Sequence, residues 1–250
     1  MTPITRCYIS VIGAMCVGLL TSAAQGAIVV QGTRVVFPEK SHEVTVRINN
    51  TSVGPVLVQN WVDDGQPDAF PEDLKVPFVV APAVARVDPG GTAVLRISAT
   101  QPQLPNDRES LFWLNVLETP PRSSSDETVL QFSFRTRIKL FFRPVGLSSN
   151  AANAAETLTW KLIRKSGDKG KQVSVMEVTN PSPYYVSFGH VGAQLTGVLI
   201  PAGTGMVGPF GKALFTLSAP LPLAHSKVSV QYEVINDYGG RRVLEKSLSE

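Results

Sequence analysis

Residues that could support catalysis or bind a metal ion are few in this chain. The three histidines, His42, His190 and His225, lie far apart and have no partners at the spacing of a metal site or a general base. No G-x-S-x-G nucleophile elbow occurs. Residues 203–208 fit G-x-G-x-x-G, but Pro209 follows and no helical pattern opens, so we predict a flexible loop between strands there. The sequence therefore predicts no enzyme, no cofactor and no metal site.

Residues 129–144 point instead to the binding of another chain. Apolar and basic side chains alternate along this stretch, which is the period of a β-strand with one apolar and one basic face, and Pro144 ends the pattern. It is either an ordinary half-buried strand of a β-sandwich or a strand whose apolar row serves another molecule. A third interpretation is that the basic row binds single-stranded nucleic acid. The apolar row begins with Leu130, Phe132, Phe134, the polar Thr136 and Ile138, and the basic row is Arg135, Arg137 and Lys139.

Residues 1–26 have the features of a secretory signal peptide. Arg6 supplies a positive charge, residues 9–20 are apolar, and Ala24 and Gly26 form a small-x-small cleavage box. We therefore expect export with cleavage after Gly26, and no membrane insertion, because a spanning helix needs about 20 apolar residues. Both cysteines lie in this segment, so no disulfide is expected in the mature chain. The mature chain keeps 22 basic and 20 acidic residues, a balance that argues against a nucleic-acid partner.

The rest of the chain predicts an all-β protein. Short apolar or alternating runs are separated by clusters of Gly, Pro, Asn and Asp, and no long amphipathic helix interrupts them. This spacing is typical of antiparallel sandwiches. We predict two immunoglobulin-like β-sandwich domains, residues 27–146 and 157–250, joined by a small, polar linker at residues 147–156.

Five motifs, in this order, give the chain a resemblance to a known family. They are TRVVF at 33–37, NDRESLFW at 106–113, IKLFFRP at 138–144, NPSPYY at 180–185 and INDYGG at 235–240. Over nearly all of its mature length the chain resembles the periplasmic PapD-like chaperones of the chaperone–usher pathway. The resemblance implies two immunoglobulin-like domains in a boomerang arrangement. It also implies a function, in which the chaperone lends one of its own strands to a pilus subunit that lacks a strand.

The resemblance further implies roles for particular residues. Arg34 and Lys139 match the pair that holds the subunit's C-terminal carboxylate in the cleft between the domains. Glu109, Arg143 and Asp237 match a charge cluster that fixes the angle between the domains. The donor strand is expected to present Leu130, Phe132, Phe134, Thr136 and Ile138 to the groove of the subunit.

The resemblance also implies partners, namely pilus subunits bound one-to-one and an outer-membrane usher that receives them from the periplasm. The connection at residues 119–128 is short, which resembles the short-loop class of the family. Self-association of the free chaperone is left open. The alternative interpretation is an exported two-domain immunoglobulin-like adhesin or other binding module, which would not require Arg34 and Lys139 to act together. For the function of the whole chain, a further alternative is a secreted hydrolase on a β-scaffold, but the sequence offers no nucleophile–base pair for it.

Overall fold

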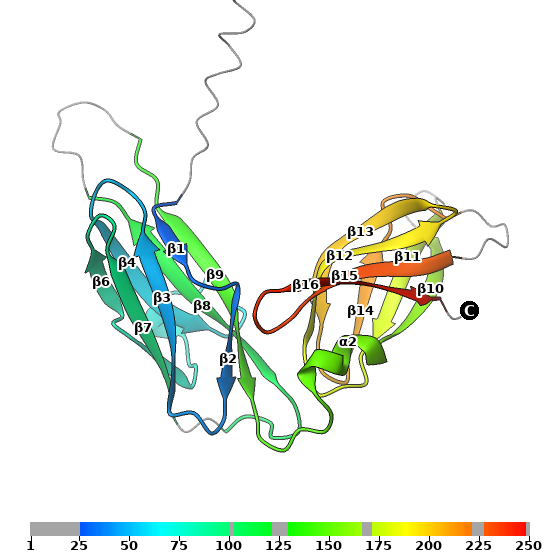
Figure 1. The fold of residues 1–250 in the computed structure, drawn as a ribbon, viewed down its shortest axis with the longest axis horizontal. Helices are drawn as coiled ribbons and strands as arrows, with labels where there is room; N and C mark the ends of the chain where they lie inside the picture. Colours follow the sequence, from blue (N-terminus) through cyan, green and yellow to red (C-terminus); the bar gives the residue numbers. More distant parts are fainter. Residues whose placement is uncertain (1–25, 101–102, 122–129, 167–171, 222–227, 249–250) are drawn as a thin grey trace, which may run out of the picture.

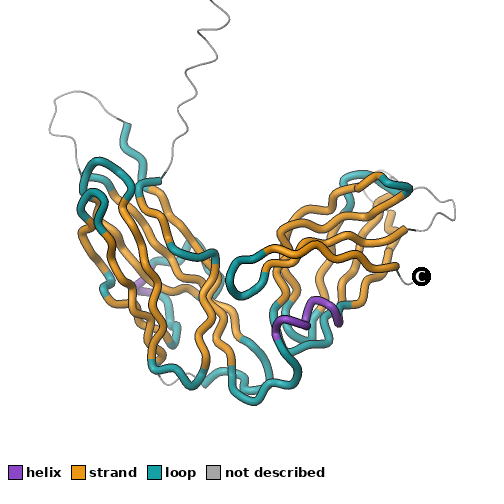
Figure 2. Tube along the Cα trace, viewed as in Figure 1, coloured by secondary structure: helices purple, strands orange, loops and turns teal. Residues whose placement is uncertain are grey.

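The computed structural model describes residues 26–100, 103–121, 130–166, 172–221 and 228–248, and it shows two β-sandwiches set at an angle like a boomerang (Figure 1). Strands make up nearly all of the regular structure, and the few helices are short (Figure 2). The predicted all-β fold of two immunoglobulin-like domains is confirmed. The predicted signal peptide lies outside the described residues apart from Gly26, as does most of the connection at 119–128.

The N-terminal sandwich packs a four-stranded sheet, β1-β3-β7-β5, on a five-stranded sheet, β2-β9-β8-β4-β6. In the second sheet β2 and β9 are parallel, and the other neighbours are antiparallel. Alternate residues such as Phe37, Leu114 and Leu140 fill the core between the sheets. The elements are β1 (Ile28–Val30), β2 (Arg34–Pro38), β3 (Glu43–Asn50), β4 (Val56–Asp63), η1 (Pro71–Asp73), β5 (Phe78–Ala81), β6 (Val84–Val87), β7 (Thr92–Ala99), β8 (Ser110–Thr119) and β9 (Phe134–Arg143).

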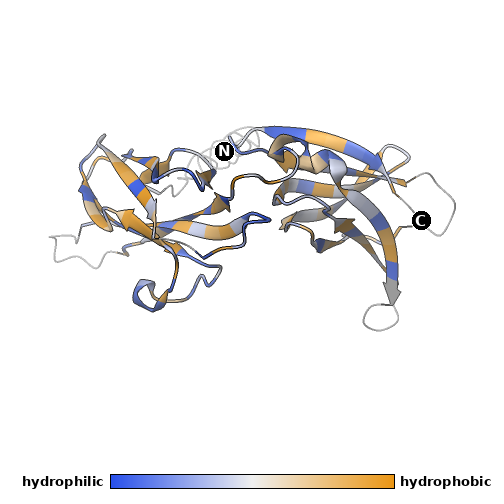
Figure 3. Ribbon diagram, turned by 90° about the horizontal axis from the view of Figure 1, so that it is seen from below, coloured by the Kyte–Doolittle hydropathy of each residue, from blue (hydrophilic) through white to orange (hydrophobic). Residues whose placement is uncertain are grey.

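The C-terminal sandwich packs the sheet β10-β11-β14 on the sheet β13-β12-β15-β16. Its core is centred on Trp160, whose ring lies 5.1–6.0 Å from the rings of Phe188, Phe215 and Tyr232. Hydrophobic and hydrophilic residues alternate along strands of both domains (Figure 3). The strands are β10 (Thr159–Ser166), β11 (Gln172–Thr179), β12 (Val186–Leu195), β13 (Val198–Val207), β14 (Lys212–Thr216), β15 (Val228–Ile235) and β16 (Arg241–Ser247).

Two segments outside residues 129–144 differ from the sequence-based expectation. The expected linker at residues 147–156 contains η2 (Ala151–Asn153) and most of α2 (Ala154–Thr157), and the first two residues of α2 are buried in the second core. The glycine pattern at 203–208 lies in β13 up to Val207 rather than in a loop, because β13 pairs with β12. Gly205 lies against Phe215, where an added Cβ would come within 2.9 Å of the ring.

The strand expected from residue 129 begins only at Phe134, as β9. The antiparallel ladder with β8 ends where Phe134 lies opposite Glu118, and β8 itself ends at Thr119. Pro120 and Pro121 follow, and proline has no N–H with which to extend a ladder. Residues 130–133 are therefore left without a paired strand in the described part of the protein.

Candidate functional site

The apolar row that precedes and opens β9 is exposed. The exposed fractions of Leu130, Phe132 and Phe134 are 81%, 58% and 38%, and the two phenyl rings lie 6.4 Å apart. Large apolar side chains that lie exposed together mark a site for a partner, since single exposed residues are ordinary but clusters are not. Residues 130–133 have no strand partner among the described residues, so this segment could also add to a sheet of another chain.

The second part of the row belongs to the protein's own core. Ile138 is only 9% exposed and packs with Leu140 and Phe142 between the two sheets of the N-terminal domain. The expectation that Ile138 enters a partner's groove is therefore corrected, because its own domain already buries it. Thr136, which lies opposite Val116 of β8, is half-buried and marks the change from the exposed to the buried part.

Arg34 and Lys139 are brought together by the parallel pairing of β2 and β9, in which they are direct register partners. Both cations reach across to the C-terminal domain. Arg34 Nη1 donates to the carbonyl of Ile235 at 2.9 Å, and Lys139 Nζ donates to Ser187 Oγ at 2.9 Å. Ser187 and Ile235 are themselves register partners in β12 and β15, so one pair of residues faces another across the domain boundary.

The two cations lie in an environment that disfavours their charge. Burial, and then the neighbouring charge of Arg34, lowers the pKa of Lys139 to about 8. Burial also lowers the pKa of Arg34, and its Nε has no hydrogen-bond partner among the described residues. The charge of Asp237 offsets part of the effect of burial on Arg34. Two close cations, one of which keeps an unused Nε donor among the described residues, favour the binding of an anion.

Glu109, Arg143 and Asp237 meet at the junction of the two domains. Arg143 Nε donates to Glu109 at 2.6 Å, and the two Nη atoms donate to the Asp237 carboxylate at 2.8 and 3.0 Å. Glu109 also accepts from the backbone N–H of Tyr185 at 2.8 Å, and its own N–H donates to the carbonyl of Pro183 at 2.9 Å. Residues of both domains are therefore joined through one guanidinium group and one glutamate.

In this cluster, burial and the neighbouring charges have opposite effects on the pKa values of Glu109 and Arg143. Burial raises the pKa of Glu109 despite the ion pair with Arg143. For Arg143, burial alone would lower the pKa, but the hydrogen bonds and charges of Asp237 and Glu109 raise it. Because burial opposes the ionisation of Glu109 even beside Arg143, this ion pair is weak evidence for stabilisation of the fold.

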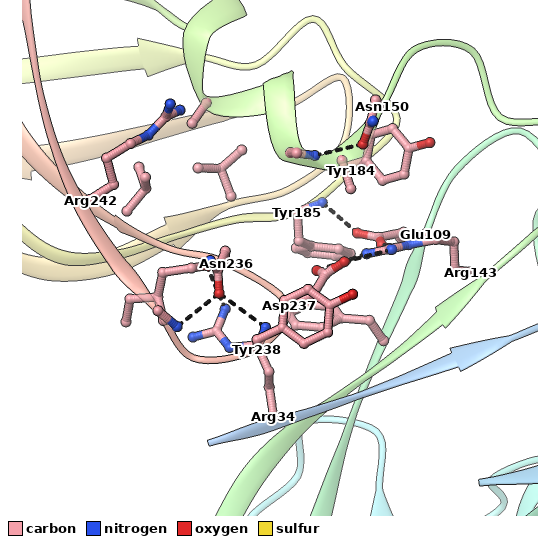
Figure 4. Close-up of a pocket in the computed structure, with 18 of the residues that line it drawn as sticks. Arg34, Glu109, Arg143, Asn150, Tyr184, Tyr185, Asn236, Asp237, Tyr238 and Arg242 are labelled. Carbon is pink, nitrogen blue, oxygen red and sulfur yellow. Dashed lines mark hydrogen bonds and ion pairs between the residues drawn. The ribbon is translucent and has the colours of Figure 1, made fainter. Parts of the chain in front are cut away.

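A cavity of about 600 Å³ lies between the domains beside this cluster. Figure 4 shows Arg34, Asp237 and Tyr238 on one side of it, with Glu109, Arg143 and Tyr185 close by. The cavity is lined by groups of both charges and by aromatic rings, so it does not have the single sign of a simple anion site. Lys139 does not line it.

The basic row of β9 is engaged by its own sheet. Arg137 donates to the buried carboxylate of Asp63 at 2.8 Å and lies over the ring of Trp113 at 4.2 Å. Arg135 donates to Asn115 at 2.8 Å and lies over the ring of Trp61 at 4.8 Å. Burial alone would raise the pKa of Asp63, but hydrogen bonds from Arg137 and Asn115 lower it. These contacts do not favour the nucleic-acid interpretation, because the two arginines already have partners.

No group of three or more His, Cys, Asp or Glu side chains among the described residues is placed to hold a metal ion. No helix among the same residues is long and apolar enough to cross a membrane.

Comparisons with known proteins give the family. The profile described as "Pili and flagellar-assembly chaperone, PapD N-terminal domain" matches residues 27–148, and "Pili assembly chaperone PapD, C-terminal domain" matches residues 153–246. The chain belongs to the PapD family of pilus assembly chaperones. The Bordetella pertussis chaperone protein FimB/FhaD is 39% identical to this PapD-family chain over 257 residues, which is 98% of each protein.

Solved structures of PapD-family chaperones agree with the fold. The Pseudomonas aeruginosa CupB2 chaperone is 48% identical, with a TM-score of 0.74, and the match covers 88% of this chain and 100% of that one. The Salmonella enterica SafB chaperone, solved in complex with the SafA pilin, is 27% identical, with a TM-score of 0.72 and coverage of 91% and 99%. The loop class within the PapD family stays a prediction.

Sequence reasoning missed the residues that support the two cations of this PapD-family chain. Ser187 and Ile235 carry no local signal, because their importance comes only from facing Lys139 and Arg34 across the domain boundary. Asp63 begins a polar, turn-like stretch in the sequence, yet it is buried and ion-paired with Arg137. Its position two residues after Trp61, at the end of an apolar stretch, is the one hint that the sequence offers.

Proposed function

We propose that this chain is a periplasmic chaperone that binds, folds and caps pilus subunits by donating residues 130–136 as a strand. The observation that carries the proposal is the exposed apolar row of Leu130, Phe132 and Phe134, which continues into β9 and leads to a pair of cations at Arg34 and Lys139. The solved complex of SafB with the SafA pilin supports it from a relative.

The donated segment would bind by β-augmentation. Its unpaired N–H and C=O groups would join the sheet of a subunit that lacks a strand, and alternate side chains would fill the subunit's groove. Burial of three large apolar side chains is worth roughly 5–9 kcal/mol before the costs of association. Ile138 is left out of the donated row because it belongs to the chaperone's own core.

The two cations would set the register of that strand. A C-terminal carboxylate placed between Arg34 and Lys139 would accept charge-assisted hydrogen bonds from both, and its negative charge would offset the repulsion between them. The end of the subunit's chain would then lie at a fixed position along β9, which determines which pocket each of Leu130, Phe132 and Phe134 enters. Glu109, Arg143 and Asp237 would hold the two domains at the angle that leaves room for the subunit.

Delivery of the capped subunit to an outer-membrane usher completes the proposed role, which is that of a binding protein without catalytic activity. Self-association of the free protein through the exposed row stays a prediction. The alternative function, an exported adhesin or binding module, shares the immunoglobulin-like fold. It is not favoured by the paired cations, which would have no shared task in it.

Co-purification from the periplasm tests the proposal. The wild-type protein should emerge in a one-to-one complex with a pilin-like subunit, identified by mass spectrometry, and should protect that subunit from degradation. Lys139→Ala should remove the subunit while the chaperone stays folded by circular dichroism. The matched control is Lys161→Ala, which changes an exposed lysine of the C-terminal domain. A Lys139→Ala protein that retains the subunit at wild-type yield would contradict the proposed cleft.

A further inference from the structure

Three carboxylates are buried among the described residues, and only two of them have a cation. Asp63 is paired with Arg137, and Glu109 is paired with Arg143. Glu118 is buried to the same degree, yet no lysine, arginine or histidine of the described chain pairs with it. A buried carboxylate without a counter-charge is rare because desolvation of the charge is costly.

The groups that face Glu118 are the backbone N–H groups of two residues at the start of the domain. Ala27 N donates to Oε1 at 2.9 Å, and Ile28 N donates to Oε2 at 2.6 Å. Ala27 is held from its other side as well, because its carbonyl accepts from Thr51 N at 2.8 Å and from Thr51 Oγ1 at 3.1 Å. The nitrogen of Ala27 is thus fixed against the carboxylate of Glu118.

We propose that Glu118 is the binding site for the α-ammonium group of Ala27, which forms when the chain is cut after Gly26. The inference rests on the expected cleavage site and is independent of strand donation. Hydrolysis of the Gly26–Ala27 bond by a peptidase consumes one water, leaves a carboxylate on Gly26 and frees an amine on Ala27 that takes up a proton at neutral pH. An amide donor at 2.9 Å from Glu118 then becomes a cation at the same place.

The position of this ion pair connects processing to the candidate site. Glu118 lies opposite Phe134 in the ladder of β8 with β9, so the new N-terminus would be fixed beside the first residue of β9. Gly26 itself lies against the carboxylate, since an added Cβ there would come within 3.1 Å of Oε1. Cleavage would remove Gly26 and leave a positive charge on Ala27 beside Glu118. This ion pair would lie at the end of the β8–β9 ladder, where residues 130–133 lead into β9.

Thermal unfolding of proteins with defined N-termini tests the inference. One form begins at Ala27 and the other at Ala24, and each is made with Glu118 and with Glu118→Gln. The melting temperature of the Ala27 form should exceed that of the Ala24 form by roughly 3–6 °C. The difference should vanish in the Glu118→Gln pair and persist in the control pair Glu72→Gln, which changes an exposed carboxylate. Equal melting temperatures, or a difference that survives Glu118→Gln, would overturn the inference.

A second measurement needs no variant. The α-amine of Ala27 in the exported protein should react with an acylating reagent about tenfold more slowly in the native than in the urea-unfolded state, because pairing with a carboxylate raises the pKa of an amine. Equal rates would overturn the inference. The mass of the exported protein separates the two premises: a chain that begins elsewhere than at Ala27 refutes the cleavage site, whereas a correct N-terminus without protection refutes only the role of Glu118.

Discussion

The two halves of residues 130–143 obey the same alternating pattern but have opposite environments. Leu130, Phe132 and Phe134 are exposed, whereas Ile138, Leu140 and Phe142 are buried. The difference comes from the neighbouring strands. Residues 139–142 are paired with both β2 and β8, residues 134–138 with β8 alone, and residues 130–133 with no strand among those described. Exposure along the apolar row therefore falls as flanking strands are added: it is highest at Leu130 and Phe132, lower at Phe134 and Ile138 beside β8 alone, and lowest at Leu140 and Phe142 between two strands.

The largest expected effect breaks the exposed half. Replacing Leu130, Phe132 and Phe134 together by serine should weaken subunit binding by at least about 1,000-fold, because the subunit's groove would lose its apolar filling. The free energy of unfolding of the free chaperone should change by less than about 0.5 kcal/mol for each exposed position. Titration calorimetry and urea unfolding measure the two quantities. A large loss of stability would mean that these side chains already serve the chaperone's own fold.

The next effect breaks the buried half. Leu140→Ala should lower the free energy of unfolding by about 2–5 kcal/mol, because it removes a fully buried side chain between the two sheets. The affinity of the remaining folded protein for the subunit should stay within a few-fold of wild type. If Leu140→Ala and the triple serine variant changed stability and affinity in the same proportion, the two halves would not be distinct.

Lys139 lies where the two halves meet, and it predicts a pH dependence. Binding of a carboxylate needs the charged lysine, so affinity should be constant below pH 8 and fall by about tenfold per unit above it. The contribution of this lysine to the stability of the free protein has the opposite sign. Since its pKa is lowered in the folded state, the unfolded chain binds more protons between pH 8 and its ordinary value near 10.5, and stability rises with pH in that window.

The control for the pH dependence is Lys139→Arg, whose guanidinium stays charged throughout the range. The decline in affinity above pH 8 should be absent in this variant. Fluorescence anisotropy with a labelled peptide of the subunit's C-terminal strand measures the affinity from pH 6 to 9.5. A wild-type affinity that does not change across pH 8 would contradict a role for the charged lysine.

The smallest effect concerns the end of the buried half, where Arg143 contacts Asp237. Asp237→Asn should lower the free energy of unfolding by no more than about 1 kcal/mol, because the aspartate is partly exposed. It should nevertheless broaden the distribution of angles between the domains, which residual dipolar couplings detect. Asp107→Asn is the matched control, since Asp107 pairs with Arg108 at the surface. An unchanged domain orientation in Asp237→Asn would show that the cluster does not fix the angle.

Sequence patterns predicted the features that depend on local alternation of side chains. They failed for features that depend on contacts between segments far apart in the sequence. The alternation in residues 129–144 predicted the strand and its two faces. The start of β9 at Phe134 could not be predicted, because it depends on where its partner β8 ends, and the sequence alone does not show that the two strands pair. The resemblance to PapD-like chaperones paired Arg34 with Lys139, and the parallel register of β2 and β9 places them side by side. No local pattern could indicate that Ser187 would face Lys139, because that contact depends on the angle between two domains.

Backbone amide hydrogen exchange, compared between the free chaperone and its subunit complex, tests strand donation most directly. Amides of residues 130–137 that are not paired with β8 should exchange rapidly in the free protein and at least about 100-fold more slowly in the complex. Amides of residues 139–142 should be protected in both states, because β2 and β8 already flank them. Equal exchange of residues 130–137 in the two states would contradict strand donation.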